Sequence, residues 1–382
     1  MDVRGIAMTK RRIALTELEI GSALTCDAYD EHGRLLLRKG QVVTSASQID
    51  RLIERGLFVE VQSTRDSVPS VAQETPSAAS LVLEARRRLQ LVCTPNGSKQ
   101  DFPQQIAAIS ELVTRACGLS EEAALATSLL QRNGRYSIRH SVDVAVACHV
   151  IGCALKTDER ELSAMIAAAL TMNISVLQLQ DILQAQKEPL SETQLKIIRH
   201  HPEASAAMLG ELGVTDQLWI ETVLSHHEAI DGSGYRQGRK GDQVPVLAQL
   251  VSLADVYCAR ISCRDYRPGL RPNAALKTLF LDQGKKVRDG LASQFIKAIG
   301  VFPPGTPVRL ENGEIGLVTQ RGASASTPQV CSIIGPRGMP LGTPVRRDTS
   351  RPTLAVREVV DWTEVGAVPS MQALWGQNGA IY

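Results

Sequence analysis

The stretch that decides the fold reads HHEAIDGSGY and runs from His226 to Tyr235. It places two adjacent imidazoles, two carboxylates and two glycines within ten residues. Imidazole is the commonest metal-binding side chain, and carboxylates bind metals or transfer protons. The Asp-Gly-Ser-Gly run predicts a tight loop, because glycine adopts backbone angles that other residues avoid. The whole stretch therefore indicates a chemical site built on a loop.

The sequence around this loop has a helical pattern from about residue 81 to residue 300. Apolar residues recur at steps of three and four, for example Ile138, Val142, Ala145, Val146 and Val150. Residues 162–170 are nearly all apolar, which predicts a central buried helix. Aromatic residues make up only 4% of the chain, so we expect an aliphatic core. Further helices are predicted over 192–199, 203–212, 217–225 and 246–261.

Smaller modules flank this helical domain. Residues 1–62 predict an α/β module with strand-like stretches at 14–28, 34–43 and 57–61 and a helix at 45–55. Residues 63–80 have the composition of a linker. Residues 301–360 alternate β-type runs with Gly and Pro turns, which predicts a small β module. Residues 361–382 are expected to form a loosely attached tail.

The composition is that of a soluble globular chain long enough for two or three domains. Of the 382 residues, 43% are hydrophobic and 21% charged, and the net charge is +2. This balance gives no electrostatic reason to expect a nucleic-acid polymer as partner. No apolar run reaches the roughly 18–20 residues that cross a bilayer. The eight scattered cysteines indicate reduced thiols. We therefore expect a cytoplasmic protein without a membrane span.

Six of the seven histidines lie in the helical region. His140 and His149 are nine residues apart, so a helix places them on roughly opposite faces and only one can face a shared site. His201 precedes Pro202, which predicts a position near the start of a helix. A single histidine is usually structural or exposed, so the prediction of a site depends on the whole set.

Asp255 is a carboxylate inside the apolar segment 246–261. A buried carboxylate without a partner is costly, so Asp255 needs a metal or a counter-charge. A salt bridge with Arg260 is the alternative to a place in the site.

Residues 130–285 resemble the HD-GYP family, which are metal-dependent phosphodiesterases of cyclic dinucleotides. The resemblance implies an HD-superfamily helical bundle that holds two or three metals, often iron or manganese. Matched by local motif, the family's ligand positions hold the expected residue type at His140, His201, His226, His227 and Asp255. The resemblance also implies nucleotide contacts at Gly234, Tyr235, Arg264 and Arg267.

The name-giving His-Asp motif of the family is replaced in this chain. Its positions fall on Met172 and Asn173, and the motif's phosphate-binding lysine falls on Val176. Methionine and asparagine are poor ligands for hard or borderline divalent metals. Two milder departures are Arg236 in place of proline and Cys258 in place of a second aspartate. The resemblance therefore implies at most one metal site, for iron, manganese or zinc.

The leading hypothesis is a degenerate HD-GYP protein in bacterial signalling. It would bind cyclic di-GMP or regulate other signalling proteins, for example of the GGDEF type, without efficient hydrolysis. The second hypothesis is a phosphodiesterase with a reduced, mononuclear site. The third is a scaffold whose histidines form a hydrogen-bonded structural cluster. Arg236, Arg239 and Lys240 add positive charge beside the loop, and the alternative for Arg239 and Lys240 is that they are solvated loop charges.

Overall fold

The computed structural model describes residues 8–12, 28–29, 35–37, 58–62, 76–94, 100–235, 237–263, 269–322, 324–366 and 368–381. The chain divides into two compact units, Met1–Thr75 and Pro76–Tyr382. The predicted helix over 45–55 lies outside the described residues, as do Arg236, Arg264 and Arg267.

The first unit contains a four-stranded antiparallel sheet with the order β1-β4-β2-β3. Its strands are β1 (Met8–Arg12), β2 (Ala28–Tyr29), β3 (Leu35–Leu37) and β4 (Phe58–Gln62). The last three fall close to the predicted strand-like stretches. Strand β1 was not predicted, and it pairs residue by residue with β4 from Met8–Gln62 to Arg12–Phe58.

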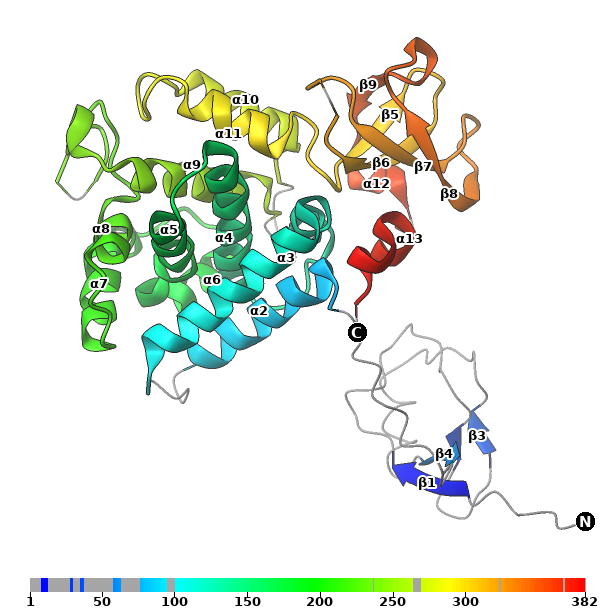
Figure 1. The fold of residues 1–382 in the computed structure, drawn as a ribbon, viewed down its shortest axis with the longest axis horizontal. Helices are drawn as coiled ribbons and strands as arrows, with labels where there is room; N and C mark the ends of the chain where they lie inside the picture. Colours follow the sequence, from blue (N-terminus) through cyan, green and yellow to red (C-terminus); the bar gives the residue numbers. More distant parts are fainter. Residues whose placement is uncertain are drawn as a thin grey trace, which may run out of the picture. The chain divides into compact units, whose positions relative to one another are not determined.

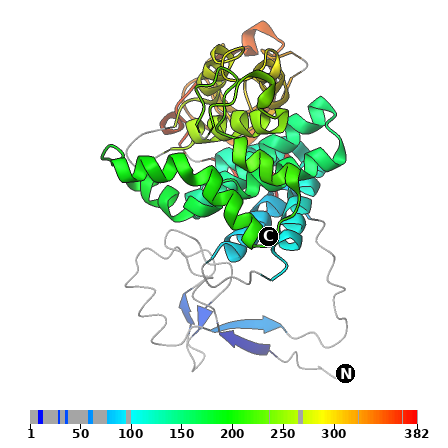
Figure 2. The same ribbon diagram turned by 90° about the vertical axis from the view of Figure 1, so that its left-hand side faces the viewer.

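The second unit begins with a helical bundle, so the predicted mainly α fold class is confirmed (Figure 1). Figure 2 shows the same bundle from its side. Its helices are α2 (Ala78–Val92), α3 (Phe102–Leu130), α4 (Tyr136–Leu155), α5 (Glu159–Thr171), α6 (Leu177–Ala185), α7 (Glu192–Glu211), α8 (Gln217–Ser225), α9 (Val246–Ile261), α10 (Pro272–Leu281) and α11 (Leu291–Ile299). Short 3-10 turns, η2 (Ile174–Val176) and η3 (Gly241–Gln243), precede α6 and α9.

Capping side chains set where two of these helices start. The hydroxyl of Ser77 accepts a hydrogen bond from Ser80 N at the start of α2, and Ser191 accepts one from Gln194 N at the start of α7. Such caps satisfy backbone donors that have no partner within the helix. Because Ser77 begins α2, residues 78–80 are helical and not part of the linker expected over 63–80.

Helix α7 is continuous, whereas the sequence predicted two helices. Pro202 lies inside α7, so the expectation that His201 lies near a helix start was wrong. A proline has no N–H for the carbonyl four residues back, which here belongs to Ile198. His201 Nδ1 supplies the missing donor and contacts Ile198 O at 2.5 Å. A site side chain therefore repairs the helix at the point where proline interrupts it.

The centre of the bundle is α4, which packs against α3, α5, α9 and α11. All five residues of its predicted apolar periodicity are buried, and so are residues 164–170 of α5. The core is largely aliphatic as predicted, with Phe102 and Phe295 its largest fully buried side chains. Burying each large apolar side chain contributes about 1.5–3 kcal/mol. This packing brings α4 and α9, far apart in the sequence, into contact.

A five-stranded antiparallel sheet follows the bundle, in the order β8-β7-β6-β5-β9. Its strands are β5 (Pro307–Leu310), β6 (Ile315–Gln320), β7 (Gln329–Ile334), β8 (Pro340–Asp348) and β9 (Val356–Val359). They lie within the predicted β module 301–360. Alternate residues of β6 face opposite sides, so Leu317 and Val318 belong to different apolar clusters.

The described residues of the segment 361–382 are packed against the rest of the protein, so the expectation of a loosely attached tail was wrong. The segment forms α12 (Trp362–Val365), α13 (Met371–Trp375) and a 3-10 turn, η5 (Gly376–Gly379). Met371 is 3% exposed and packs against Ala79 of α2 and Ala126 of α3. Ser77 Oγ donates to Ala380 O, which ties the end of the described chain to the start of α2. Composition missed this because the anchoring residues are few and widely spaced.

Two helical stretches, Tyr136–Leu155 and Glu159–Ala185, are long and apolar enough to cross a membrane by composition. In each, 72% of the most apolar window is buried inside the protein. The buried helices of a core have the same composition, so these stretches are weak signals of a membrane span.

Candidate metal centre

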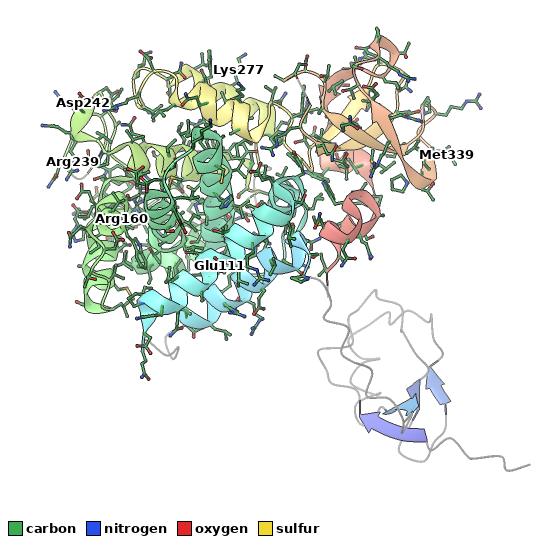
Figure 3. The ribbon with its side chains drawn as sticks, in the orientation of Figure 1. Glu111, Arg160, Arg239, Asp242, Lys277 and Met339 are labelled. Carbon is green, nitrogen blue, oxygen red and sulfur yellow. The ribbon has the colours of Figure 1, made fainter. Side chains whose placement is uncertain are left out.

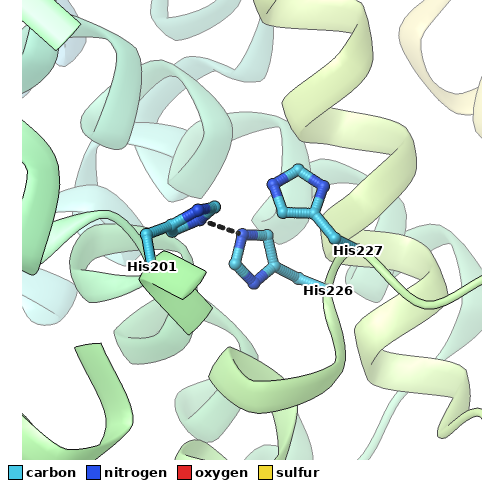
Figure 4. Close-up of side chains that lie close together, drawn as sticks. All are labelled: His201, His226 and His227. Carbon is cyan, nitrogen blue, oxygen red and sulfur yellow. Dashed lines mark hydrogen bonds between the residues drawn. The ribbon is translucent and has the colours of Figure 1, made fainter. Parts of the chain in front are cut away.

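Three predicted ligands meet in one cluster. His201 comes from α7, while His226 and His227 follow directly after α8 (Figure 4). One ring nitrogen from each lies within 4.8 Å of the others, and within the described part of the chain no second group of this kind is found. His201 and His226 are buried and His227 is partly buried. The adjacent pair and the distant histidine therefore converge as predicted.

Helix α8 carries the adjacent pair to the cluster. Trp219 Nε1 on α8 donates to Thr171 Oγ1 at the end of α5 at 2.8 Å, which ties these two helices together. His226 Nδ1 then contacts Val223 O at 2.7 Å. The last carbonyls of a helix have no donor within the helix, so the side chain of His226 satisfies one of them.

The two carbonyl contacts fix how His201 and His226 face each other. Because Nδ1 of each ring donates to a carbonyl, the lone pair of each Nε2 is left to face the site. These two Nε2 atoms are 3.2 Å apart. Two lone pairs at that distance repel each other unless a cation or proton lies between them. A tetrahedral ion with bonds of about 2.0–2.1 Å holds its ligand nitrogens roughly 3.3 Å apart, so the pair fits a metal ion.

Burial keeps the three imidazoles neutral near pH 7. It lowers the pKa of His201, and it lowers the pKa of His226 well below the ordinary value, with His227 and His201 adding to the effect. Burial also lowers the pKa of His227 to about 4. A neutral imidazole is the form that binds a metal, so these shifts favour metal binding over protonation.

His140 and Asp255 form a separate buried pair beside this cluster. His140 Nε2 on α4 and Asp255 Oδ1 on α9 are 2.7 Å apart. Burial raises the pKa of Asp255, but the hydrogen bond and attraction of His140 outweigh it, so that pKa lies well below its usual range. The alternative partner was wrong, because Arg260 instead contacts Thr278 and Asp282.

The second ring nitrogen of His140, Nδ1, takes no part in this pairing. His140 Nδ1 is buried and has no hydrogen-bond partner among the described residues. The ring stacks on Tyr136, with centroids 5.4 Å apart. His149, on the other face of α4, instead contacts Cys153, as the spacing of the two histidines predicted. His140 is thus the histidine of α4 that faces the site.

The signature loop is held by backbone contacts that sequence reasoning missed. The carboxylate of Glu228 accepts hydrogen bonds from Gln237 N at 2.7 Å and Arg239 N at 3.0 Å. A Cβ at Gly234 would lie 2.5 Å from the Cα of Glu228, so only glycine fits there. The sequence signal for this role was the position of Glu228 inside the signature stretch. Both carboxylate oxygens of Glu228 therefore hold the backbone of the loop.

Tyr235 closes the loop onto His227. Its N–H donates to His227 O at 3.1 Å, and the two rings stack with centroids 4.6 Å apart. Burial raises the pKa of Tyr235, so its phenol stays protonated. Arg239 pairs with Glu221 and also donates to Ser225 Oγ at 3.1 Å, and is therefore neither free nor simply solvated. Figure 3 labels Arg239 and Asp242 at the outer side of this loop.

The substituted motif lies where α5 ends and packs on α7. Met172 is fully buried in the apolar core, and Asn173 and Val176 are also buried. Ser175 Oγ between them donates to His201 O at 3.2 Å. The motif positions therefore adjoin the triad through the backbone of His201, but they add neither a histidine nor a carboxylate to it.

Residues 119–289 match the HD domain family. The chain contains an HD domain. It is 26% identical over 350 residues to the cyclic di-GMP phosphodiesterase PA4108 of Pseudomonas aeruginosa, which covers 84% of each chain. It is also 25% identical over 186 residues to the cyclic di-GMP phosphodiesterase PdeB of Borreliella burgdorferi, covering 49% of each.

A solved structure, Bd1817, an HDG"Y"P protein from Bdellovibrio bacteriovorus, aligns with a TM-score of 0.49 and 16% identity. The alignment covers 76% of this chain and 99% of that one. The family recognised from the sequence is confirmed by the HD domain match and by the phosphodiesterase relatives.

Proposed function

We propose that the HD domain binds cyclic di-GMP at a single-metal centre and does not hydrolyse it efficiently. The protein would act as a receptor or regulator in bacterial cyclic di-GMP signalling. The observation that carries this proposal is the division of the five predicted ligands into two groups. His201, His226 and His227 keep open nitrogens, whereas His140 and Asp255 bind each other at 2.7 Å.

The second group is too poor in ligands to hold a metal firmly. His140 and Asp255 offer two side chains, and Met172 and Asn173 stand where the family supplies two more. A thioether and a neutral amide bind hard divalent ions weakly. Met172 also contributes to the apolar core, so its position is part of the packing of the bundle. Hydrolysis that requires two metals is therefore disfavoured in this chain.

His201, His226 and His227 would hold a divalent iron, manganese or zinc ion. When bound, such an ion supplies Lewis acidity toward a phosphate oxygen. The chain's own residues orient the site: carbonyls of Ile198 and Val223 fix two imidazoles, and Tyr235 stacks on the third. These contacts limit ring rotation, which would favour the bound geometry.

One observation favours a second candidate, a phosphodiesterase with a mononuclear site. Catalytic zinc sites commonly use three protein ligands and keep one position open. Three neutral histidines meet that requirement. PA4108 and PdeB are named as phosphodiesterases, so hydrolysis is the activity to test directly.

The cellular compartment and the protein partners are also proposals. We place the protein in the cytoplasm, which is supported by the free state of the cysteines in the described part of the chain. Other signalling proteins, for example of the GGDEF type, are the proposed partners.

The test is cyclic di-GMP turnover by the full chain, loaded anaerobically with iron(II) or manganese(II) and followed by chromatography. We expect no product at catalytic rates, together with measurable binding in a titration of the same sample. His226→Ala should lose bound metal, and His200→Ala is the matched control, because the His200 side chain is 72% exposed and outside the cluster. Turnover that disappears in His226→Ala would establish the mononuclear phosphodiesterase instead.

Restoring the motif tests whether the missing metal ligands alone account for the expected lack of hydrolysis. Met172→His with Asn173→Asp should raise the metal content from one ion per chain toward two and create cleavage. A double variant that binds two metals yet remains inactive would show that the motif alone did not disable the site.

A further inference from the structure

A cavity of about 540 Å³ opens beside His140. Its wall is formed by residues between 128 and 143, by Asp181 and Gln184 of α6, and by residues between 258 and 263 at and just after the end of α9. This volume lies within the range of about 300–1,000 Å³ that is usual for small-molecule sites. The cavity thus reaches from the surface to the buried His140–Asp255 pair.

Three arginines line the cavity, and their charges are not all balanced. Arg135 pairs with Asp181 at 2.7 Å, which neutralises one of them. Arg132 and Arg139 form no ion pair with any carboxylate in the described ranges. The other lining carboxylate, Asp143, lies one helical turn after Arg139 and would be its natural partner. Asp143 instead accepts from Arg86 at 2.6 Å.

Arg139 is the least satisfied of these cations. Its Nε is buried without a hydrogen-bond partner among the described residues. Burial lowers the pKa of Arg139, which reflects the cost of holding its charge away from water. Arg139 as a whole is partly buried. A partly buried cation without a bonded counter-charge pays part of the cost of desolvation, and an anionic ligand would offset that cost.

Arg132 is held at the rim by residues from two modules. Its Nε donates to Leu129 O at 3.0 Å and its Nη1 to Cys263 Sγ at 3.1 Å. The guanidinium also lies over the ring of Trp362, 5.3 Å from its centroid. Trp362 belongs to α12, which follows the C-terminal sheet. The C-terminal module therefore reaches the wall of this cavity.

We propose that this cavity binds the phosphate groups of the ligand through Arg139 and Arg132, and that Trp362 positions Arg132. The inference rests on the proposed function in taking that ligand to be cyclic di-GMP. A cyclic dinucleotide carries two phosphodiester charges, and the described lining has two cations without ion pairs. Guanidinium groups suit this role because they donate two parallel hydrogen bonds to phosphate oxygens.

The experiment is a calorimetric titration of the metal-loaded full chain with cyclic di-GMP. Arg139→Gln and Arg132→Gln should each weaken binding by about tenfold to hundredfold. Arg160→Gln on the exposed side of α5, labelled in Figure 3, should leave the affinity unchanged and serves as the matched control. Unchanged affinity in both cavity variants would overturn the proposal. Arg139→Lys keeps the charge and replaces Arg139→Gln if that variant fails to fold.

Trp362→Leu tests the positioning role through coupling. It should weaken binding in the wild-type chain but have no further effect in an Arg132→Gln background. Additive losses in the double variant would show that Trp362 acts on structure in general and would overturn its role toward Arg132.

The two proposals can fail separately. If the wild-type chain binds no cyclic di-GMP, the proposed function fails, and the same titration is repeated with pyrophosphate. Pyrophosphate binding that is lost in Arg139→Gln would keep the cavity as a phosphate site for another ligand. Binding that does not depend on Arg139, or no binding at all, would overturn the cavity as well.

Discussion

At the scale of single residues, the site depends on carbonyls that the helices leave without donors. Ile198 O lacks one because Pro202 has no N–H, and Val223 O lacks one because α8 ends. His201 and His226 fill these two positions through Nδ1. The same hydrogen bonds that complete the helices therefore turn both Nε2 atoms toward the site.

Pro202→Ala tests this link directly. Alanine restores the backbone N–H, which would take Ile198 O and release the ring of His201. We expect a more stable helix, together with metal affinity lowered about tenfold to hundredfold, because the contact that orients the ligand is lost. Thermal unfolding of the metal-free chain and a competition titration with zinc would measure the two effects. If stability rises while affinity is unchanged, the carbonyl contact is not what orients His201.

The sequence predicted the three histidines of the cluster but not what fixes them. The His226-His227 pair and His201 could be found because metal ligands are few residue types in a recognisable pattern. The role of Pro202 depends on whether a helix continues through a proline, and tertiary packing decides that. The bracing by Glu228 could not be predicted because its partners are backbone N–H groups, which any residue provides.

At the scale of elements, an ion pair links two strands of the C-terminal sheet that are not neighbours. Arg347 of β8 donates to both carboxylate oxygens of Glu314, at 2.7 and 2.8 Å, just before β6. This hydrogen bonding lowers the pKa of Glu314. The short β-type runs and the Gly and Pro turns between them predicted the sheet. The pairing of Glu314 with Arg347 depends on the register of the strands, which those runs do not reveal.

Glu314→Gln should make the stability of the sheet less dependent on pH. A lowered folded pKa contributes stability that is fully present above the unfolded value near 4.5 and is lost as pH falls through the folded value. At pH 7 we expect a Tm lower by about 3–8 °C, and a smaller difference from wild type at pH 3. Glu311→Gln, an exposed neighbour, is the control. A difference that stays constant with pH would contradict the role of the charge.

At the scale of the whole molecule, the site and cavity are products of long-range packing. His140 and Asp255 are 115 residues apart and meet only because α4 packs on α9. Spacing suggested Arg260 as the alternative partner of Asp255, because local pairs are visible in a sequence and distant ones are not. The arginine cavity was missed for the same reason, since its wall comes from three separated segments.

The last segment of the chain joins the sheet module to the bundle, and Met371 is the residue to test. It is 3% exposed and packs between α2 and α3, whereas Met339, at the turn between β7 and β8, is 70% exposed (Figure 3). Met371→Ala should lower the free energy of unfolding by about 2–5 kcal/mol, because it leaves a cavity in a packed interface. Met339→Ala should change it by no more than about 0.5 kcal/mol.

Urea unfolding followed by far-ultraviolet circular dichroism and by tryptophan fluorescence would measure the effect of Met371→Ala. The helices dominate the first signal, and Trp362 and Trp375 of the last segment contribute to the second. If Met371 couples the modules, the two transitions coincide in the wild-type chain and separate in the variant, with the fluorescence change first. Equal effects of the two methionine substitutions, with coincident transitions in both, would show that the segment 361–381 adds no coupling. Trp362 also contacts Arg132. If the two unfolding transitions separate in Met371→Ala, this variant should therefore also bind the ligand of the cavity more weakly.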